Sequence, residues 1–524
     1  MKNELSTRVA DPSRTIQRIT RGSRWIRFHR PLSLSVLLSV AGLVGDGDLR
    51  AQTAPPSPSQ PWSPPGLEVY EKDLAAWPSS DAKIDPDKVY DLSELIDIAE
   101  STNPQTRVAW ERARQAAAAV GLSKSAYLPY LAASAGALYE KAFIPFPALQ
   151  QGPGPTDVTV VGGGNLGFEA TSTRVALGMK WLLFDFGERD ATKTMAEEGL
   201  TAANVGFNAV HQRVVFLVAR RYYQFNSARQ RVEAAETSKK AADTVADSAR
   251  ARLEHGLATR PEVLQAEELA ARDAFELAAA RGAVSDALVD LVESLGILPT
   301  TKLQVATLPE RSFDRDTTAS LEDLIGRALV QRPDLVARLA RVRASKAEVQ
   351  RARAAYYPKI VLDAHVGWLD LNVSVKGSPY FGGNQAVYGA GILVSVPVFD
   401  GFARRERLRI AESELQASED ELEDSRDSVM REVWRARTQV ETALSKLDPA
   451  EKLIAASESA FAASLEAYRH GLATYVEVSN AQRSVASARS VMVDTRSAVY
   501  TSLTSLALTV GDLARPAPKP GGQP

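Results

Sequence analysis

The chain has 524 residues, with 62 Lys and Arg against 64 Asp and Glu, so its formal net charge is −2. A charge balance this close to neutral provides no strong attraction to nucleic acid, which we do not expect as a partner. The sequence contains no cysteine, which excludes disulfides, thiolate metal sites, cysteine nucleophiles and a lipid anchor attached through an N-terminal cysteine.

The N-terminal segment has the pattern of a signal peptide. Five arginines between positions 18 and 30 lead into an apolar run over residues 31–45, and Leu49-Arg50-Ala51 follows. We therefore predict a signal peptide over 1–51, cleaved after Ala51. The alternative is a single membrane anchor, for which the run is short against the ~20 residues of a span. A Pro-rich leader is predicted over 52–90 and a disordered tail over 514–524.

A helical pattern follows in two pieces. Residues 91–101 are amphipathic and are stopped by Asn103-Pro104, and Pro104 can open a second helix that runs to about Tyr127, before Pro129. The same plan recurs later in the chain at a constant offset, where Leu324, Pro333 and Pro358 repeat Leu95, Pro104 and Pro129.

After Pro129 and Pro358 the periodicity changes from helical to alternating. Over residues 174–183 apolar side chains fall on one face and polar or small ones on the other, and residues 130–140 show a weaker version. Residues 360–368 and 388–398 repeat the alternation more strongly. Strands of about 11 residues with aromatic ends match strands that cross a bilayer, although a half-buried sheet in a soluble domain gives the same pattern.

Each pair of strands leads into a very long helical pattern. Residues 187–254 contain no proline and little glycine, and 402–469 is a counterpart of the same length. A helix of this length spans about 100 Å. Shorter helices are predicted to return over 260–295 and 475–510.

The returning helices are roughly thirty residues shorter than the long helices that they run beside. The deficit is filled if the helices opened by Pro104 and Pro333 stack end to end above them. Alanine and other small residues dominate all these helices, which favours close helix packing. Helices this long cannot bury their apolar stripes within one protomer, so partners are needed.

A glycine interrupts the helical pattern at two equivalent points. The segments His255-Gly256-Leu257 and His470-Gly471-Leu472 have the same sequence, and each glycine can take the positive φ that ends a helix. Thr259 and Thr474 can cap the returning helices. The two segments are therefore predicted to be the tips of two long helical hairpins.

The repeated spacing predicts an internal duplication. The first repeat covers 91–300 and the second 320–513, with a linker over 301–319. The offset between equivalent positions is larger before the strands than after them. The first repeat therefore carries an insertion, which we place in a surface loop over 146–165.

Four strands per chain are too few to close a barrel in a membrane, where an open sheet edge is not tolerated. Three chains would supply twelve strands, and the duplicated hairpins would pack with near-sixfold symmetry. The predicted fold is therefore an α+β membrane protein, in which a long α-helical barrel continues a trimeric 12-stranded β-barrel.

The sequence resembles the TolC-type outer-membrane efflux proteins. The shared motifs occur in order over residues 91–513. The resemblance implies a homotrimeric duct in the outer membrane that extends into the periplasm and passively conducts small molecules, with no enzymatic activity and no cofactor. It further implies contact with outer-membrane lipid, a periplasmic adaptor (membrane fusion) protein and an inner-membrane transporter of a tripartite efflux pump. The motifs are Asn103-Pro104 and Arg332-Pro333-Asp334-Leu335 at helix starts, Tyr127-Leu128-Pro129 and Tyr357-Pro358 before strands, Phe-Asp after strands, and the Gly-Leu tips.

The resemblance also implies roles for the tip residues. It places the adaptor on His255, Gly256, Leu257, His470, Gly471 and Leu472, although histidine replaces the family's usual small residue. Glu477 would form a cation-selective ring at the periplasmic aperture, with Asn480 one turn further and Glu262 at the equivalent point of the first repeat. Tyr468 could hydrogen-bond to Glu262 and hold the aperture shut. Alternatively, both glutamates only complement the positive helix N-termini.

Four polar residues of the strands are expected to line the pore, or to pair with one another: Arg174, Lys180, Asp363 and His365. No catalytic residue is predicted, and the tip histidines are expected to be solvated turn residues rather than metal ligands or a pH switch. Two alternatives to the efflux duct stay open. One is a type I secretion duct for polypeptides with the same architecture, and the other is a coiled-coil adaptor or scaffold.

Overall fold

The computed structural model describes residues 58–59, 66–76, 84–154, 156–308, 319–375 and 380–513. The predicted signal peptide and C-terminal tail lie outside these residues, as do parts of the predicted leader and linker. The chain divides into two units, Met1–Pro78 and Ser79–Pro524. In the first unit, the nine-residue helix α2 (Leu67–Ala75) buries none of its residues.

In the second unit, side-chain caps set the starts of the first two helices. The Asp91 carboxylate accepts from the Glu94 backbone N–H, and the Glu94 carboxylate accepts from the Asp91 N–H, which starts α3 (Leu92–Thr102). Asn103 caps α4 (Pro104–Ser125), whose first residue needs no N–H at that position. Both helices lie where the sequence predicts them.

The first long helix also matches its prediction. The helix α5 (Glu188–Glu254) has 67 residues without a break, and α6 (Arg260–Leu295) runs back along it. The second repeat follows the same order, with α7 (Leu321–Gln331), α8 (Pro333–Ala354) and a returning helix α11 (Tyr475–Val510).

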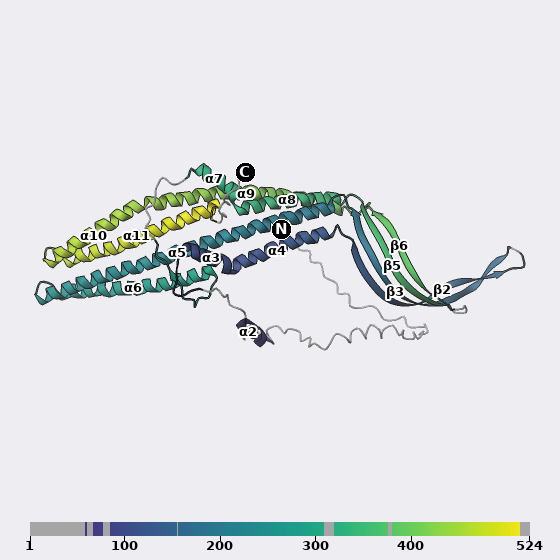
Figure 1. Cartoon of the computed structure of the whole chain (residues 1–524), viewed down its shortest axis with the longest axis horizontal. Helices are drawn as coiled ribbons and strands as arrows, with labels where there is room; N and C mark the ends of the chain where they lie inside the picture. The colour runs from purple at the N-terminus through teal and green to yellow at the C-terminus, as the bar shows by residue number, and fades with distance from the viewer. Residues whose placement is uncertain are drawn as a thin grey trace, which may run out of the picture. The chain divides into compact units, whose positions relative to one another are not determined.

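The second long helix is broken, so the continuous helix predicted over 402–469 is wrong. It forms α9 (Ala403–Ser445) and α10 (Leu447–Arg469), which Lys446 separates. Pro449 explains the break, because proline has no N–H to donate to the Ser445 carbonyl and its ring crowds that carbonyl. The hairpins formed by α5 with α6 and by α10 with α11 lie side by side, with the strands at the end opposite to the tips (Figure 1).

The short helices stack end to end on the returning helices, as predicted. The Thr102 hydroxyl donates to the Leu295 carbonyl over 2.6 Å, and the Asn103 amide donates to the Ser294 carbonyl over 3.0 Å. Gly296 ends α6 with φ 71°, and a Cβ at this position would lie 2.8 Å from the Cα of Asn103. Only glycine fits where the end of α6 meets the start of α4.

Four antiparallel strands form one sheet in the order β2-β3-β5-β6. Their bounds are Tyr130–Gln151 for β2, Val158–Phe184 for β3, Lys359–Val375 for β5 and Phe381–Ser395 for β6. The last strand ends before Pro397 and short of the predicted position 398, because proline cannot donate to a strand ladder. Within the described residues, no helix has an apolar stretch long enough to cross a bilayer.

The surface loop predicted over 146–165 is also wrong. These residues extend the β2–β3 hairpin, in which Phe146 pairs with Gly164 and Gln151 with Val158. The hairpin closes where the Gly152 N–H donates to the Asp157 carbonyl over 2.6 Å. Ladder pairing satisfies the backbone groups of the insertion, and this outweighs its glycine- and proline-rich composition.

A two-stranded parallel sheet was not predicted. The strand β1 (Val89–Tyr90) pairs with β4 (Gln304–Val305), although the sequence places one in the leader and the other in the linker. Tyr90 and Val305 are buried in an apolar core that also contains Leu95 of α3, Val218 of α5 and Leu291 of α6. This core fixes α3 against the hairpin formed by α5 and α6.

Candidate functional site

The strand register brings the four predicted polar residues onto one face of the sheet. Lys180 of β3 lies opposite Asp363 of β5, and His365 lies opposite Gly178. Arg174 is on the same face because side chains alternate along a strand. The other face carries large apolar side chains that are exposed in the single chain, namely Val175, Leu177, Val366, Trp368, Tyr388 and Ile392.

Both edges of this sheet are free. Among the described residues, β2 pairs only with β3 and β6 only with β5. Each edge therefore presents a row of backbone N–H and C=O groups without a strand partner, which favours pairing with another chain.

The polar face of the sheet contains a hollow of about 810 Å³. Arg174 and His365 line it, together with the small residues Ser134, Ala176 and Gly367. The sequence predicts the first two as pore-lining residues but contains no signal for the hollow, which depends on how four strands align.

Ion pairs stabilise the two turns that join the sheet to the long helices. The Asp185 carboxylate accepts from both the backbone N–H and the Nε of Arg189, at 2.8 and 3.1 Å. Asp400 and Arg404 repeat this arrangement at 3.0 Å for both bonds. Each turn also holds a phenylalanine at positive φ, 54° in the first and 68° in the second. The sequence predicts the Phe-Asp motif, but not the arginine four residues later that binds the aspartate.

The two predicted tips lie at the ends of α5 and α10. Gly256 and Gly471 have φ values of 71° and 75°, as a turn after a helix requires. The residues that follow are exposed, Leu257 by 65% and Leu472 by 83%. The side chain of Thr474 caps α11, as predicted. The equivalent Thr259 makes no side-chain cap on α6, so the prediction for this helix is wrong.

The two tip histidines lie in the turns that end the helices. His255 and His470 are both exposed, and the Nε2 of His470 lies 2.9 Å from the Oε1 of Glu466. Within the described residues, no group of three or more His, Asp or Glu side chains is placed to hold a metal ion.

An arginine of the first tip binds the second tip. The Nη1 of Arg252 donates to the Tyr468 carbonyl over 2.6 Å and its Nη2 donates to the Leu257 carbonyl over 3.0 Å. The guanidinium also lies 4.7 Å from the centroid of the Tyr468 ring. Sequence reasoning missed Arg252, because its counterpart in the second repeat is Ala467 and the duplication gives no signal.

The latch predicted between Tyr468 and Glu262 is absent from the single chain. The Tyr468 side chain is only 1% exposed, and its hydroxyl has no hydrogen-bond partner among the described residues. Burial and the nearby negative charge of Glu262 raise the pKa of Tyr468, so the phenol stays neutral at physiological pH.

The other predicted aperture residues lie at the starts of the returning helices. The Glu477 carboxylate accepts from the Thr474 N–H over 3.0 Å, so it takes part in the cap of α11, as the alternative interpretation expects. Glu262 holds the equivalent third position of α6 and is half-buried, and Asn480 is exposed on α11.

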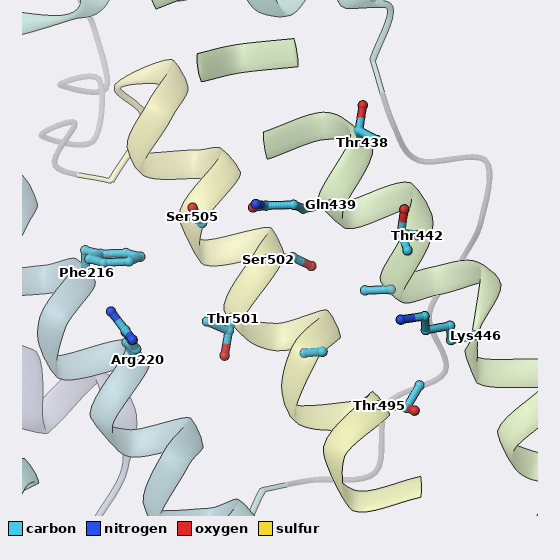
Figure 2. Close-up of a pocket in the computed structure, with 12 residues that line it drawn as sticks. Phe216, Arg220, Thr438, Gln439, Thr442, Lys446, Thr495, Thr501, Ser502 and Ser505 are labelled. Carbon is cyan, nitrogen blue, oxygen red and sulfur yellow. The ribbon is translucent and has the colours of Figure 1, made fainter. Parts of the chain in front are cut away.

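A second hollow, of about 650 Å³, lies between α5, α9 and α11 next to the helix break. Gln439 and Lys446 point from the α9 side toward α11, which contributes Ser502 and Ser505 (Figure 2). The described residues that line it include no carboxylate and no histidine, so the hollow offers no acid–base pair for catalysis.

The paired repeats, the single sheet and the glycine tips can be compared with known proteins. The model of the outer membrane efflux protein family matches residues 95–297 and 324–512, one segment in each predicted repeat. The chain belongs to the outer membrane efflux protein family.

Individual relatives agree with this family. Protein CyaE of Bordetella pertussis is 31% identical over 401 residues, which cover 74% of this chain and 76% of CyaE. Fusaric acid resistance protein FusA of Burkholderia cepacia is 26% identical over 387 residues, covering 72% and 68%. In fold, the chain is similar to the outer-membrane channel OprN, with a TM-score of 0.68 at 21% identity over 80% of this chain and 89% of OprN.

Family membership confirms several of the predictions. The chain is a TolC-like outer-membrane efflux protein that extends into the periplasm, and its fold is that of channels with a helical barrel and a β-barrel. Its relatives and structural neighbours are export and channel proteins rather than enzymes. The alternative of a coiled-coil adaptor or scaffold is therefore no longer supported.

Proposed function

We propose that three copies of this chain close a 12-stranded barrel and form the exit duct of a tripartite efflux pump. The observation that carries the proposal is the four-stranded sheet with two free edges and one exposed apolar face. In lipid, free edges must be paired, and the edge of β6 in one copy can pair with that of β2 in the next. The apolar face then contacts outer-membrane lipid, and Arg174, Lys180, Asp363 and His365 face the lumen.

The helices continue the duct into the periplasm. Each chain contributes two hairpins, and their apolar side chains that are exposed in one copy, such as Phe275 and Trp434, are then covered by neighbouring copies. The duct carries small molecules passively, which is consistent with the name of FusA as a resistance protein. The transported compounds are those that its inner-membrane transporter delivers.

The tips bind the periplasmic adaptor in this proposal. Leu257 and Leu472 are exposed apolar side chains on turns that glycine holds in shape, so that an adaptor hairpin can pack on them. The two tip histidines flank these turns.

The residues next to the tips form the periplasmic aperture. Glu262, Glu477, Asn480 and Tyr468 all lie within a few helical turns of a tip glycine. Glu477 supplies cation selectivity as well as a helix cap, since three copies of its charge would meet in a narrow opening.

Two experiments test this function. Outer-membrane fractions should contain an oligomer that migrates as a trimer on SDS gels without heating and as a monomer after boiling, and the purified protein should form channels in planar bilayers. A chain that stays monomeric and does not conduct would contradict the proposal.

Adaptor docking is tested separately by single-cysteine crosslinking. The sequence contains no cysteine, so each introduced cysteine is the one reactive thiol of the chain. Cysteine at His255 or His470 should crosslink to the adaptor in cells, whereas cysteine at the exposed Asp424 of α9, far along the chain from either tip, should not. Equal crosslinking at all three positions would argue against tip docking.

A further inference from the structure

The hollow on the polar face of the sheet has a floor of small residues. One row across the strands consists of Ser134 of β2, Ala176 of β3, Gly367 of β5 and Val387 of β6. A Cβ at Gly367 would lie 2.5 Å from the Val175 carbonyl oxygen, so no larger residue fits there without a shift of the backbone. Because β5 approaches β3 so closely, only glycine fits at position 367, and this part of the floor has no side chain.

Two side chains that can carry positive charge bound the floor at its ends. Arg174 belongs to the next row on one side and His365 to the next row on the other. Four residues separate these two rows along a strand, which places their backbones about 13 Å apart. The His365 ring lies against Gly389, where a Cβ would come within 3.0 Å of the ring. The space between the two ends suits a molecule of one or two fused rings.

The charge of Arg174 is not neutralised locally. Among the described residues it makes no hydrogen bond or ion pair, whereas Lys180 on the same face lies opposite Asp363. A guanidinium without a carboxylate partner, next to a hollow, is a donor pair for a carboxylate ligand.

Apolar side chains complete the walls. Leu369 lines the hollow from the row that contains Arg174, and Leu138 lines it from the row beyond. A flat ligand can therefore lie on the floor with its ring against a leucine and its charged group on the guanidinium.

We propose that this hollow is a transit site for flat organic anions, namely aromatic carboxylates, with Arg174 binding the carboxylate and the Ser134–Ala176–Gly367 floor receiving the ring. The inference rests on the proposed function, in which this face lines the duct. It assigns the lumen a preference for one chemical class, which the family alone does not.

The test is block of single-channel current in planar bilayers by 2-naphthoate, with the neutral 2-naphthol as the matched probe. The mature full-length protein should be blocked in a concentration-dependent way by the anion and at least about tenfold less strongly by the neutral compound. The variant Arg174→Gln should raise the half-blocking concentration of 2-naphthoate about tenfold or more, the effect of losing one charge-assisted interaction.

A second variant fills the hollow without removing the charge. Gly136 lies opposite Arg174 on β2, and a Cβ there meets no atom within 4 Å, so Gly136→Leu adds bulk beside the guanidinium without a backbone clash. It should weaken the block as Arg174→Gln does. The control Gly391→Leu adds the same side chain on the same face opposite Asp363, outside the hollow, and should leave the block unchanged.

The outcomes separate the two proposals. Channels that conduct but are blocked equally by both probes, or equally in the wild type and Arg174→Gln, would overturn the anion site and leave the duct standing. If Gly391→Leu weakened the block as much as Gly136→Leu, general narrowing of the pore would replace the site. A protein that forms no channels would overturn the duct and the site together.

Discussion

The two helical hairpins share a backbone plan but differ in the contacts that they make. Each ends at a glycine with positive φ, followed by an exposed leucine and a threonine before the returning helix. Only the second tip caps that helix with its threonine, and only the first tip contributes an arginine that binds the other tip. The helix that leads to the first tip is continuous, whereas the one that leads to the second is broken at Lys446.

The difference shows which features a duplication retains. Positions where the backbone must turn are kept, because any residue other than glycine is strained there. Positions whose side chains connect the two repeats have diverged, because each such contact needs a hydrogen-bond donor in one repeat and an acceptor in the other. The resulting asymmetry lets the first hairpin hold the second at the tips, through the contact of Arg252 with Tyr468.

The largest effect is expected at the sheet-to-helix junction, where the two copies look alike. The Asp185 side chain is 6% exposed and that of Asp400 is 26% exposed. The substitution Asp185→Ala removes the carboxylate bound to the half-buried Arg189, which keeps its hydrogen bonds to the Leu182 and Leu183 carbonyls, and should cost about 3 kcal/mol of stability. Asp400→Ala should cost less because water already reaches the Asp400 carboxylate in the folded protein and screens its pair with Arg404. Thermal unfolding in detergent, followed by circular dichroism, measures both, with the exposed Asp190→Ala as control. Equal losses of stability in all three variants would show that the ion pairs at the junctions do not stabilise the fold more than an exposed carboxylate does.

The next effect concerns the arginine that only the first tip provides. Arg252→Ala removes two charge-assisted hydrogen bonds to carbonyl groups and should free the second tip, at a cost of about 2–3 kcal/mol. In planar bilayers we expect longer or more frequent open states. The control is Arg250→Ala on the same helix, whose exposed pairs with Asp247 and Glu267 contribute little. Similar gating in both variants would mean that the contact between the tips does not restrain the aperture.

A smaller effect is expected where the two hairpins meet along their length. Gln482 of α11 is 3% exposed, and its amide donates to the Ser238 carbonyl of α5 over 3.3 Å and to the Asp273 carboxylate of α6 over 3.0 Å. The Gln482 Oε1 has no partner among the described residues. Burial, together with the charges of Glu276 and Asp243, raises the pKa of Asp273, against the opposing effects of the Gln482 amide and a nearby arginine. A protonated Asp273 can donate to the free Oε1.

This contact gives a prediction about pH. A carboxyl whose pKa is raised by folding contributes stability that is fully present below its unfolded pKa of about 3.9 and is lost as pH rises through the folded value. Asp273→Asn keeps a donor for Gln482 at every pH, so it should stabilise the protein at pH 7 by about 1 kcal/mol and remove part of the pH dependence. Asp247→Asn, at an exposed helix pair, is the control. If the difference in the free energy of unfolding between the wild type and Asp273→Asn were the same at pH 4 and pH 7, the raised pKa of Asp273 would not affect stability as expected.

The smallest effect concerns the break in the second hairpin. Pro449→Ala restores the N–H that can donate to the Ser445 carbonyl, so α9 and α10 should become continuous. Since the break lies at an exposed position, the gain in stability should be under about 1 kcal/mol. Hydrogen exchange at residues 445–450 should slow markedly while exchange in α5 stays the same. Unchanged exchange at these residues would show that something other than Pro449 causes the break.

Much of the fold follows from the sequence because it depends on neighbours in the chain. The helices that begin at Pro104, Arg260 and Tyr475 start where the sequence places them, since caps, prolines and glycines act within a few residues. The strand alternation likewise predicts which face carries Arg174. The break at Lys446 belongs to the same class, because Pro449 acts on the carbonyl only four residues before it.

The candidate site was predicted less completely. The tip segments can be predicted because glycine and the repeat both point to them. The hydrogen bond predicted from Tyr468 to Glu262 does not form within the single chain, where Arg252 binds the Tyr468 carbonyl instead. The small sheet of β1 and β4 was missed because a pair of two-residue strands has no periodicity to detect. The insertion was predicted to be a loop from its composition, which does not report whether a strand partner is available.

The sequence by itself determined the periodic elements, the two turns and the duplication, because helix and strand periods and the demand for positive φ are local properties of the chain. The tertiary structure alone decided which side chains bridge the copies and where the sheet is hollow. Arg252 meets Tyr468, and Gln482 meets Asp273, although each pair is widely separated in sequence. Such contacts depend on how helices and strands align in space, and no local pattern encodes that alignment.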